Sequence, residues 1–375
     1  MTPCYDQGTP PWADLPPELL GMVFLRLPTR ADRARFPATA VPSAFHTARP
    51  STYLKGLAIT TLMASGFSLS REDDTCFLMN PFTKATMEIP NLSSYSPYYD
   101  PVETDNDHVP NYGMPGTWMD FMGSKDVSVV TLTVCSTRLI AAVLSVGDCG
   151  EYFCTIALCR PGAAAWSVRA QEQRRCLSDM VFLKGKLYTI DAFTEDLLAV
   201  DIVDEDDNSE PRMSKIERII KGAPMPYFQY FNRVPYLLES DDTLLMIRRK
   251  ISYTTELIAT RISPLHVAGT SEFEVLKADF GCSLWTGTRS LGVDLALFLG
   301  RGCSRAVCVS PHDLSHDCIF FVDDYIDGWY WKNTTTSCGV YDMKDGKVYS
   351  PMPQVSWKSG KVPATWLFSQ GNLDY

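Results

Sequence analysis

Short runs of apolar and β-branched residues, separated by turn signals, recur through most of the chain. Such runs are typical of β-strands, and no sustained 3.6-residue period is found after Leu57. Pro81, Lys184-Gly185, Ser240 to Asp242 and Lys344 to Gly346 mark turns between neighbouring runs. The pattern predicts strands over residues 76–80, 85–89, 127–135, 139–146, 152–158, 166–168, 181–183, 186–191, 197–203, 236–239, 244–248, 256–262, 296–300, 306–310 and 318–322, and a final hairpin over 338–349.

These strands fall into groups of roughly 40 to 50 residues, which is the period of a β-propeller blade. A β-sandwich needs only about 100 residues, so this region would have to hold several sandwiches, yet no linker divides it. The predicted fold is therefore mainly β, with a single propeller over residues 57–370. No WD or kelch signature repeats at fixed offsets, which indicates divergent blades and leaves their number open.

The first 50 residues follow a different pattern. Apolar residues at 19, 20, 23, 24 and 27 form the stripe of an amphipathic helix. Pro17 suits the first helical position and Pro28 ends the helix, while two shorter helices are expected near 30–36 and 43–48. Helices this short are marginal alone, so the stripe packs either on the rest of the chain or on a partner.

The spacing of this stripe resembles the opening of an F-box, the helical motif that docks onto the Skp adaptor of cullin-type ubiquitin ligases. The resemblance gives residues 12–50 as an F-box-like segment and implies partnership with Skp and, through it, cullin. Pro37 and Pro42 interrupt the second half, and the Trp usual in plant F-boxes is missing. The Skp-binding residues that the resemblance implies are Leu15, Pro16, Leu19, Leu20, Val23, Phe24, Leu27 and Pro28.

A second resemblance covers roughly residues 57 to 368. The runs 183–188, 236–249, 296–300, 318–324 and 339–346 resemble, in order and spacing, the motifs of the KIB-type β-propeller of plant F-box proteins. The combination with an N-terminal F-box is typical of that family, which is expanded in grasses.

Composition and charge limit the class of protein and the kinds of partner that it can bind. Hydrophobic residues make up 45% and charged residues 21% of the chain, which excludes a mainly disordered protein. The formal net charge of −10 disfavours nucleic acid as a partner. Because no export signal or membrane-length apolar run is found, we expect a soluble intracellular protein in the nucleus, the cytoplasm or both.

Two clusters suggest metals without fitting a known site. Cys303, Cys308, His312, His316 and Cys318 lie together, but only three residues separate Cys308 from His312, so we expect structural thiols, with Cys308 and Cys318 buried in strands. The acidic run 204–210 lacks the Gly and the bidentate Glu of a calcium loop. We expect no metal and no other cofactor.

Catalytic motifs are also missing. The chain has five histidines and no nucleophile elbow, zinc-protease motif, P-loop or dinucleotide fingerprint. We therefore expect a non-catalytic protein, although a propeller hydrolase or lectin is a third alternative.

Aromatic residues in turn-rich segments are the better indication of binding. One group, including Tyr95 and Tyr98, lies between the first two sets of strands, and another lies near residue 330. They either anchor a target protein or plug the propeller channel. The candidate target-binding residues are Tyr112, Trp118, Trp329, Tyr330 and Trp331.

The leading hypothesis is a substrate-recognition subunit of a Skp-cullin-F-box ubiquitin ligase, in which the propeller binds an unknown target protein. The alternative is a propeller scaffold protein whose F-box has decayed and no longer joins a ligase.

Overall fold

The computed structural model describes part of the chain in detail. The described residues are 68–72, 75–80, 85–98, 127–146, 153–170, 175–204, 209–223, 233–254, 266–292, 294–300, 302–309, 316–322, 339–349 and Trp366. The chain divides into two compact units, one formed by Met1–Leu57 with Tyr349–Val362 and the other by Ala58–Val348 with Pro363–Tyr375. The second unit contains nearly all of the described residues. The predicted F-box helices lie outside the described residues.

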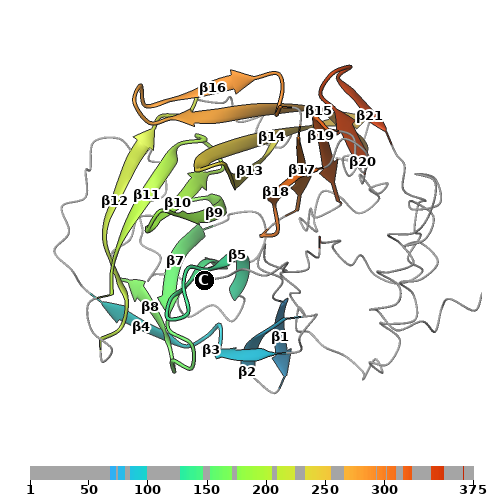
Figure 1. Ribbon diagram of the computed structural model, residues 1–375. Helices are drawn as coiled ribbons and strands as arrows, with labels where there is room; N and C mark the ends of the chain where they lie inside the picture. The colour runs from blue at the N-terminus through green and yellow to red at the C-terminus, as the bar shows by residue number, and fades with distance from the viewer. Residues whose placement is uncertain are drawn as a thin grey trace, which may run out of the picture. The chain divides into compact units, whose positions relative to one another are not determined.

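The described elements are all strands, and they form five sheets (Figure 1). The smallest, the N-terminal sheet, has three antiparallel strands. The other four sheets have four or five strands each, which is the size of a propeller blade. The N-terminal sheet comprises β1 (Ser68–Glu72), β2 (Thr75–Met79) and β3 (Thr86–Ile89).

The four larger sheets are called blades 1 to 4 in chain order. In blade 1, β4 comes first in the sequence but pairs in parallel with β8 at the outer edge. Blade 1 comprises β4 (Tyr95–Tyr98), β5 (Val127–Val134), β6 (Ile140–Val146), β7 (Phe153–Cys159) and β8 (Trp166–Arg169). Blade 2 comprises β9 (Leu177–Leu183), β10 (Lys186–Asp191), β11 (Leu197–Val203) and β12 (Arg212–Ile220).

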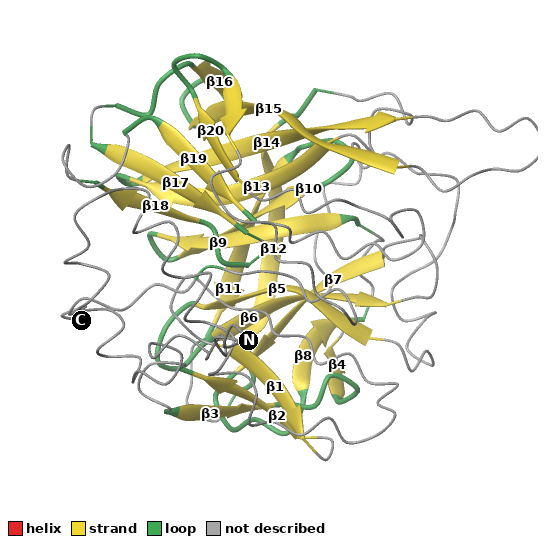
Figure 2. Cartoon of the chain, turned by 90° about the vertical axis from the view of Figure 1, so that its right-hand side faces the viewer, coloured by secondary structure: helices red, strands yellow, loops and turns green. Residues whose placement is uncertain are grey.

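Blade 3 contains the two longest strands, β14 and β15, which run beyond their neighbours as a long hairpin (Figure 2). In blade 4, β17 pairs in parallel with β19. Blade 3 comprises β13 (Arg233–Ser240), β14 (Thr243–Thr254), β15 (His266–Asp279) and β16 (Leu284–Thr288). Blade 4 comprises β17 (Leu295–Leu299), β18 (Arg305–Cys308), β19 (Cys318–Phe321), β20 (Gly339–Asp342) and β21 (Lys347–Tyr349).

Strand periodicity explains how the blades pack. Because successive side chains point to opposite faces, one strand can contribute to two cores. In β6, Ile140, Ala142 and Leu144 face the N-terminal sheet. The residues between them, Ala141 and Val143, face blade 2. Further apolar cores lie between blades 2 and 3 and between blades 3 and 4, so each sheet packs on the next in chain order.

The inner edges of the blades meet. β5 contacts β9, β9 contacts β13, and β13 contacts β18. These strands lie toward the middle of the view in Figure 1, while β12, β16 and β21 lie at the periphery. This arrangement of successive face-packed blades is that of a propeller, and the described residues confirm the predicted mainly β fold.

Most predicted strands are confirmed, but the pattern does not predict β1, β4, β12, β15 and β16. The segment expected to be a strand at 256–262 lies outside the described residues. The turns at Lys184-Gly185 and Asp241-Asp242 are confirmed, and both residues of each turn have positive φ. That conformation matches the right-handed twist of a two-residue hairpin.

The expectation that Tyr95 and Tyr98 belong to a binding segment is wrong. The sequence places them in a turn-rich binding segment, but they lie in β4, where Tyr98 is buried. The Tyr98 hydroxyl accepts a hydrogen bond from the Met213 amide at 2.8 Å and thereby joins the outer strands of blades 1 and 2. These two tyrosines are structural.

Candidate interaction surface

The turn between β10 and β11 places the carboxylate of Glu195 inside the junction of blades 2 and 3. Asp191, at the start of the turn, holds the turn in shape. Asp191 Oδ1 accepts hydrogen bonds from the amides of Phe193 and Thr194, each at 2.9 Å. Burial raises the pKa of Asp191, and these two amide hydrogen bonds oppose that rise. The turn ends with Glu195 at a φ of 57°, which directs its fully buried side chain toward blade 3.

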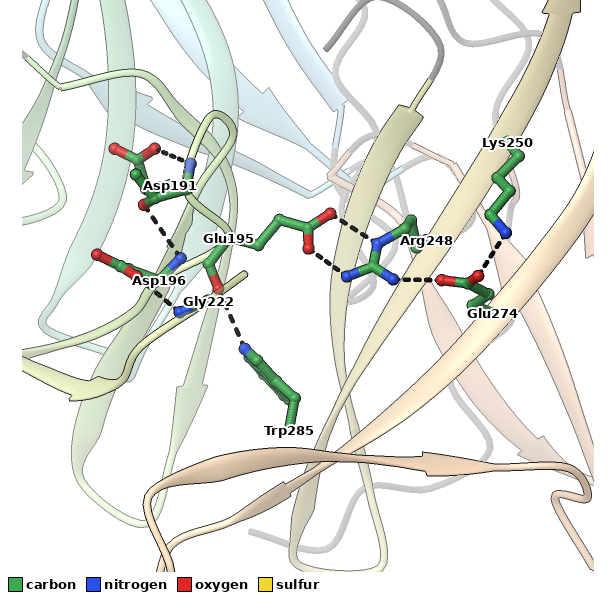
Figure 3. Close-up of polar contacts among 9 residues, drawn as sticks. Asp191, Glu195, Asp196, Gly222, Arg248, Lys250, Glu274 and Trp285 are labelled. Carbon is green, nitrogen blue, oxygen red and sulfur yellow. Dashed lines mark hydrogen bonds and ion pairs between the residues drawn. The ribbon is translucent and has the colours of Figure 1, made fainter. Parts of the chain in front are cut away.

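Glu195 pairs with Arg248 of β14 through both carboxylate oxygens (Figure 3). The Arg248 Nε donates to Glu195 Oε1 at 2.7 Å, and Nη2 donates to Oε2. Arg248 also donates to Glu274 of β15, its direct cross-strand neighbour. A bidentate guanidinium–carboxylate pair fixes orientation as well as distance. The long hairpin of blade 3 is therefore tied to a turn of blade 2.

The ion pairs continue along the hairpin. Lys250 Nζ pairs with Glu274 and, at 3.0 Å, with Glu272. Burial alone would lower the pKa of Arg248 and of Lys250, but their carboxylate partners raise both pKa values above the ordinary ones. Burial pushes the pKa of Glu274 upward, whereas Lys250 and Arg248 together lower it below its usual value. Arg248, Lys250 and Glu274 therefore stay charged around neutral pH.

Two further contacts fix the same junction, and one contact within blade 2, between Asp196 and Gly222, fixes the turn that carries Glu195. The carbonyl of Glu195 accepts a hydrogen bond from Trp285 Nε1 at 3.1 Å. Asp196 Oδ1 accepts one from the Gly222 amide at 2.7 Å, and a Cβ at Gly222 would overlap the carbonyl oxygen of Thr194. Nearer the inner edge, Asp179 Oδ2 accepts a hydrogen bond from the Leu237 amide at 2.9 Å. The junction thus ties the inner strands β9 and β13 to each other and the outer strand β16 to the β10–β11 turn.

Exposed apolar side chains lie at the turn between β15 and β16. Phe280 and Leu284 flank the β15–β16 turn and are 41% and 52% exposed. The Phe280 ring lies 5.8 Å from that of Tyr188 in blade 2. We call Phe280 and Leu284 the hairpin surface. Exposed aromatic and aliphatic side chains on a rigid element are suited to anchoring a partner protein.

The charged side chains at this junction pair with one another. The carboxylate of Glu195 and the guanidinium of Arg248 are mutually paired and buried or nearly so. Among the described residues, no group of three or more His, Cys, Asp or Glu side chains could hold a metal ion. Within the same residues, no helix is long and apolar enough to cross a membrane.

The residues predicted for Skp and target binding, namely Leu15 to Pro28, Tyr112, Trp118 and Trp329 to Trp331, all lie outside the described residues. In the suspected metal cluster, Cys303 and Cys318 are buried, as expected for structural thiols. The expectation of a buried Cys308 is wrong, because this residue ends β18 with its side chain exposed. Its apolar neighbours in the sequence suggested burial, but β18 is an inner edge strand whose residues are only partly covered.

The hairpin surface is a site that no motif in the sequence indicates. Polar and apolar residues alternate around Phe273 and Val275, and this alternation would have indicated β15. Both apolar side chains are buried. Exposure of Phe280 and Leu284 then follows from their places in a turn and an outer strand.

Comparison with known families agrees with this architecture. The KIB1-4 beta-propeller model matches residues 27–342. No curated protein and no solved structure matches the chain. A domain of this kind suggests protein–protein interaction, in keeping with the exposed hairpin surface. Because the match covers most of the chain and the four larger sheets form its blades, the protein belongs to the KIB1-4 β-propeller family.

Proposed function

We propose that the protein is a non-catalytic substrate-recognition subunit of a Skp-cullin-F-box ubiquitin ligase in the nucleus, the cytoplasm or both. The observation that carries the proposal is the spacing of Leu19, Leu20, Val23, Phe24 and Leu27 upstream of a propeller of the KIB1-4 family. The stripe binds Skp, and the propeller binds the target. The ligase then raises the effective concentration of target lysines beside activated ubiquitin.

Two double variants separate the two halves of this proposal. Leu20→Ala with Phe24→Ala removes two apolar side chains four residues apart on the predicted helix. Burying such a pair is worth about 3 to 6 kcal/mol, so Skp binding should weaken roughly 10² to 10⁴-fold. Co-purification with Skp measures this, and the melting transition of the propeller should hardly change.

The matched control is Phe280→Ala with Leu284→Ala on the hairpin surface. This variant should still co-purify with Skp, but it should no longer capture the target protein when the proteasome is inhibited. Wild-type Skp binding by the Leu20/Phe24 variant would contradict the F-box assignment. Suppose that neither the wild type nor the Leu20/Phe24 variant binds Skp, and that this variant melts at a lower temperature than the wild type. The apolar stripe then packs on the chain itself. That result would favour the scaffold alternative, which the prolines at 37 and 42 motivate.

A further inference from the structure

The outer edges of the four blades differ in how they are protected. An edge strand offers unpaired N–H and C=O groups, and proteins usually shield it with charges, proline or a very short strand. β12 has Arg212, Lys215, Glu217 and Arg218. β4 contains Pro97, and β21 has three residues including a lysine. β16, with the sequence Leu-Trp-Thr-Gly-Thr, has none of these features.

The edge of β16 is open. Leu284, Thr286 and Gly287 are exposed, and a Cβ placed on Gly287 would meet no atom within 4 Å. β16 is the last strand of its sheet, at the periphery of the blade (Figure 1). The hydroxyl of Thr286 donates to the Lys277 carbonyl at 3.2 Å, so it bonds to the neighbouring strand β15.

This edge is also rigid. Five cross-strand residue pairs join β16 to β15. Trp285 points toward blade 2 and donates to the Glu195 carbonyl. A strand held in this way is already in the extended conformation that an added strand requires, which reduces the entropy lost on binding.

The side chains beside the edge define the class of ligand. Lys277 and Thr286 are directly opposite each other and therefore share a face, together with Leu284. Lys277 is exposed, and no ion pair of Lys277 is found among the described residues. Asp279, on the same face, already accepts the Cys282 amide at 2.9 Å. The available groups are one apolar side chain, one cation and a row of backbone donors and acceptors.

We propose that β16 is a docking edge to which an extended segment of a partner protein adds as a further strand, with an apolar residue beside Leu284 and an Asp or Glu within reach of Lys277. This inference rests on the proposed protein-binding role of the propeller but not on the ligase assignment. Main-chain hydrogen bonds supply affinity in this mode, and the alternating side chains supply specificity.

A phage-displayed library of random twelve-residue peptides, selected on the full chain, tests the proposal. Before selection, peptides that bind the double variant Leu284→Lys with Thr286→Lys are removed from the library. This variant places two charges on the edge at exposed positions. The surviving peptides should alternate apolar and acidic residues, and should bind the double-lysine variant about tenfold or more weakly. Hydrogen exchange of the peptic fragments spanning β16 should slow when peptide binds. Glu217→Lys, on the shielded edge β12, is the control and should bind like the wild type.

Lys277→Glu should shift selection toward apolar and basic peptides. The proposal is overturned if no peptide survives depletion, or if the survivors bind without slowing exchange in β16. Skp capture is measured on the same proteins. Failure to bind Skp with retained peptide binding would contradict the ligase assignment alone.

Discussion

The junction between blades 1 and 2 and the junction between blades 2 and 3 are held in different ways. The first has a large apolar core that includes Val143, Ile156 and Val200. Its charged groups lie outside that core: Arg169 donates to the carbonyls of Met213 and Ser214 in the outer strand β12, and the Arg160–Asp204 pair lies beyond the ends of β7 and β11. The second has a smaller apolar core and places the Glu195–Arg248 pair inside it. Apolar packing tolerates small shifts, whereas a bidentate pair fixes two backbones in orientation. The polar junction therefore fixes the orientation of the β14–β15 hairpin relative to blade 2.

The largest effect is expected from Glu195→Ala. This change leaves Arg248 nearly buried without its bidentate partner, and breaking a buried pair typically costs about 3 to 5 kcal/mol. Urea unfolding should show the loss as a lower midpoint with an unchanged slope. Glu195→Gln, which keeps the shape and part of the hydrogen bonding, should lose less. Equal losses for both variants would mean that the shape and neutral hydrogen bonds of residue 195 contribute little and that the loss comes from its charge.

A smaller effect is expected from Ile156→Val in the apolar junction. Removing one buried methylene should cost about 0.5 to 1.5 kcal/mol. Because no charge is involved, the loss should be the same at 50 mM and 500 mM salt. A salt-dependent loss would show that the two junctions are coupled and would break the comparison.

The smallest effect concerns pH and Glu274. Its pKa is lower in the folded protein than in the unfolded chain, so its contribution is present above the unfolded pKa and is lost as pH falls through the folded pKa. The group is partly exposed, so we expect about 1 kcal/mol or less. The difference in urea midpoint between wild type and Glu274→Gln should shrink between pH 6 and pH 3, a window set by the ordinary carboxyl pKa of about 4.3. A difference that stays constant over this range would mean that the lost charge of Glu274 does not matter.

The apolar junctions could be predicted from the sequence and the polar one could not. The nearly continuous apolar run 139–146 indicates both the strand and its two buried faces, because such a run is a local property of the chain. Glu195 and Arg248 are 53 residues apart, and the turn that joins them depends on a positive φ at a glutamate. The polar strand β12 was missed for a related reason. Its alternation is interrupted by charges that serve an outer edge, so its pattern does not indicate burial.

The pairing of β4 with β8 has a consequence for how such a protein can diversify. Residues 99–126 link β4 to β5, and both of these strands belong to blade 1. An insertion, deletion or replacement in that link begins and ends on the same sheet, so it does not have to change the spacing between blades. Evolution, or an engineer grafting a foreign recognition sequence, can therefore rewrite this stretch while the register of the neighbouring blades is inherited unchanged.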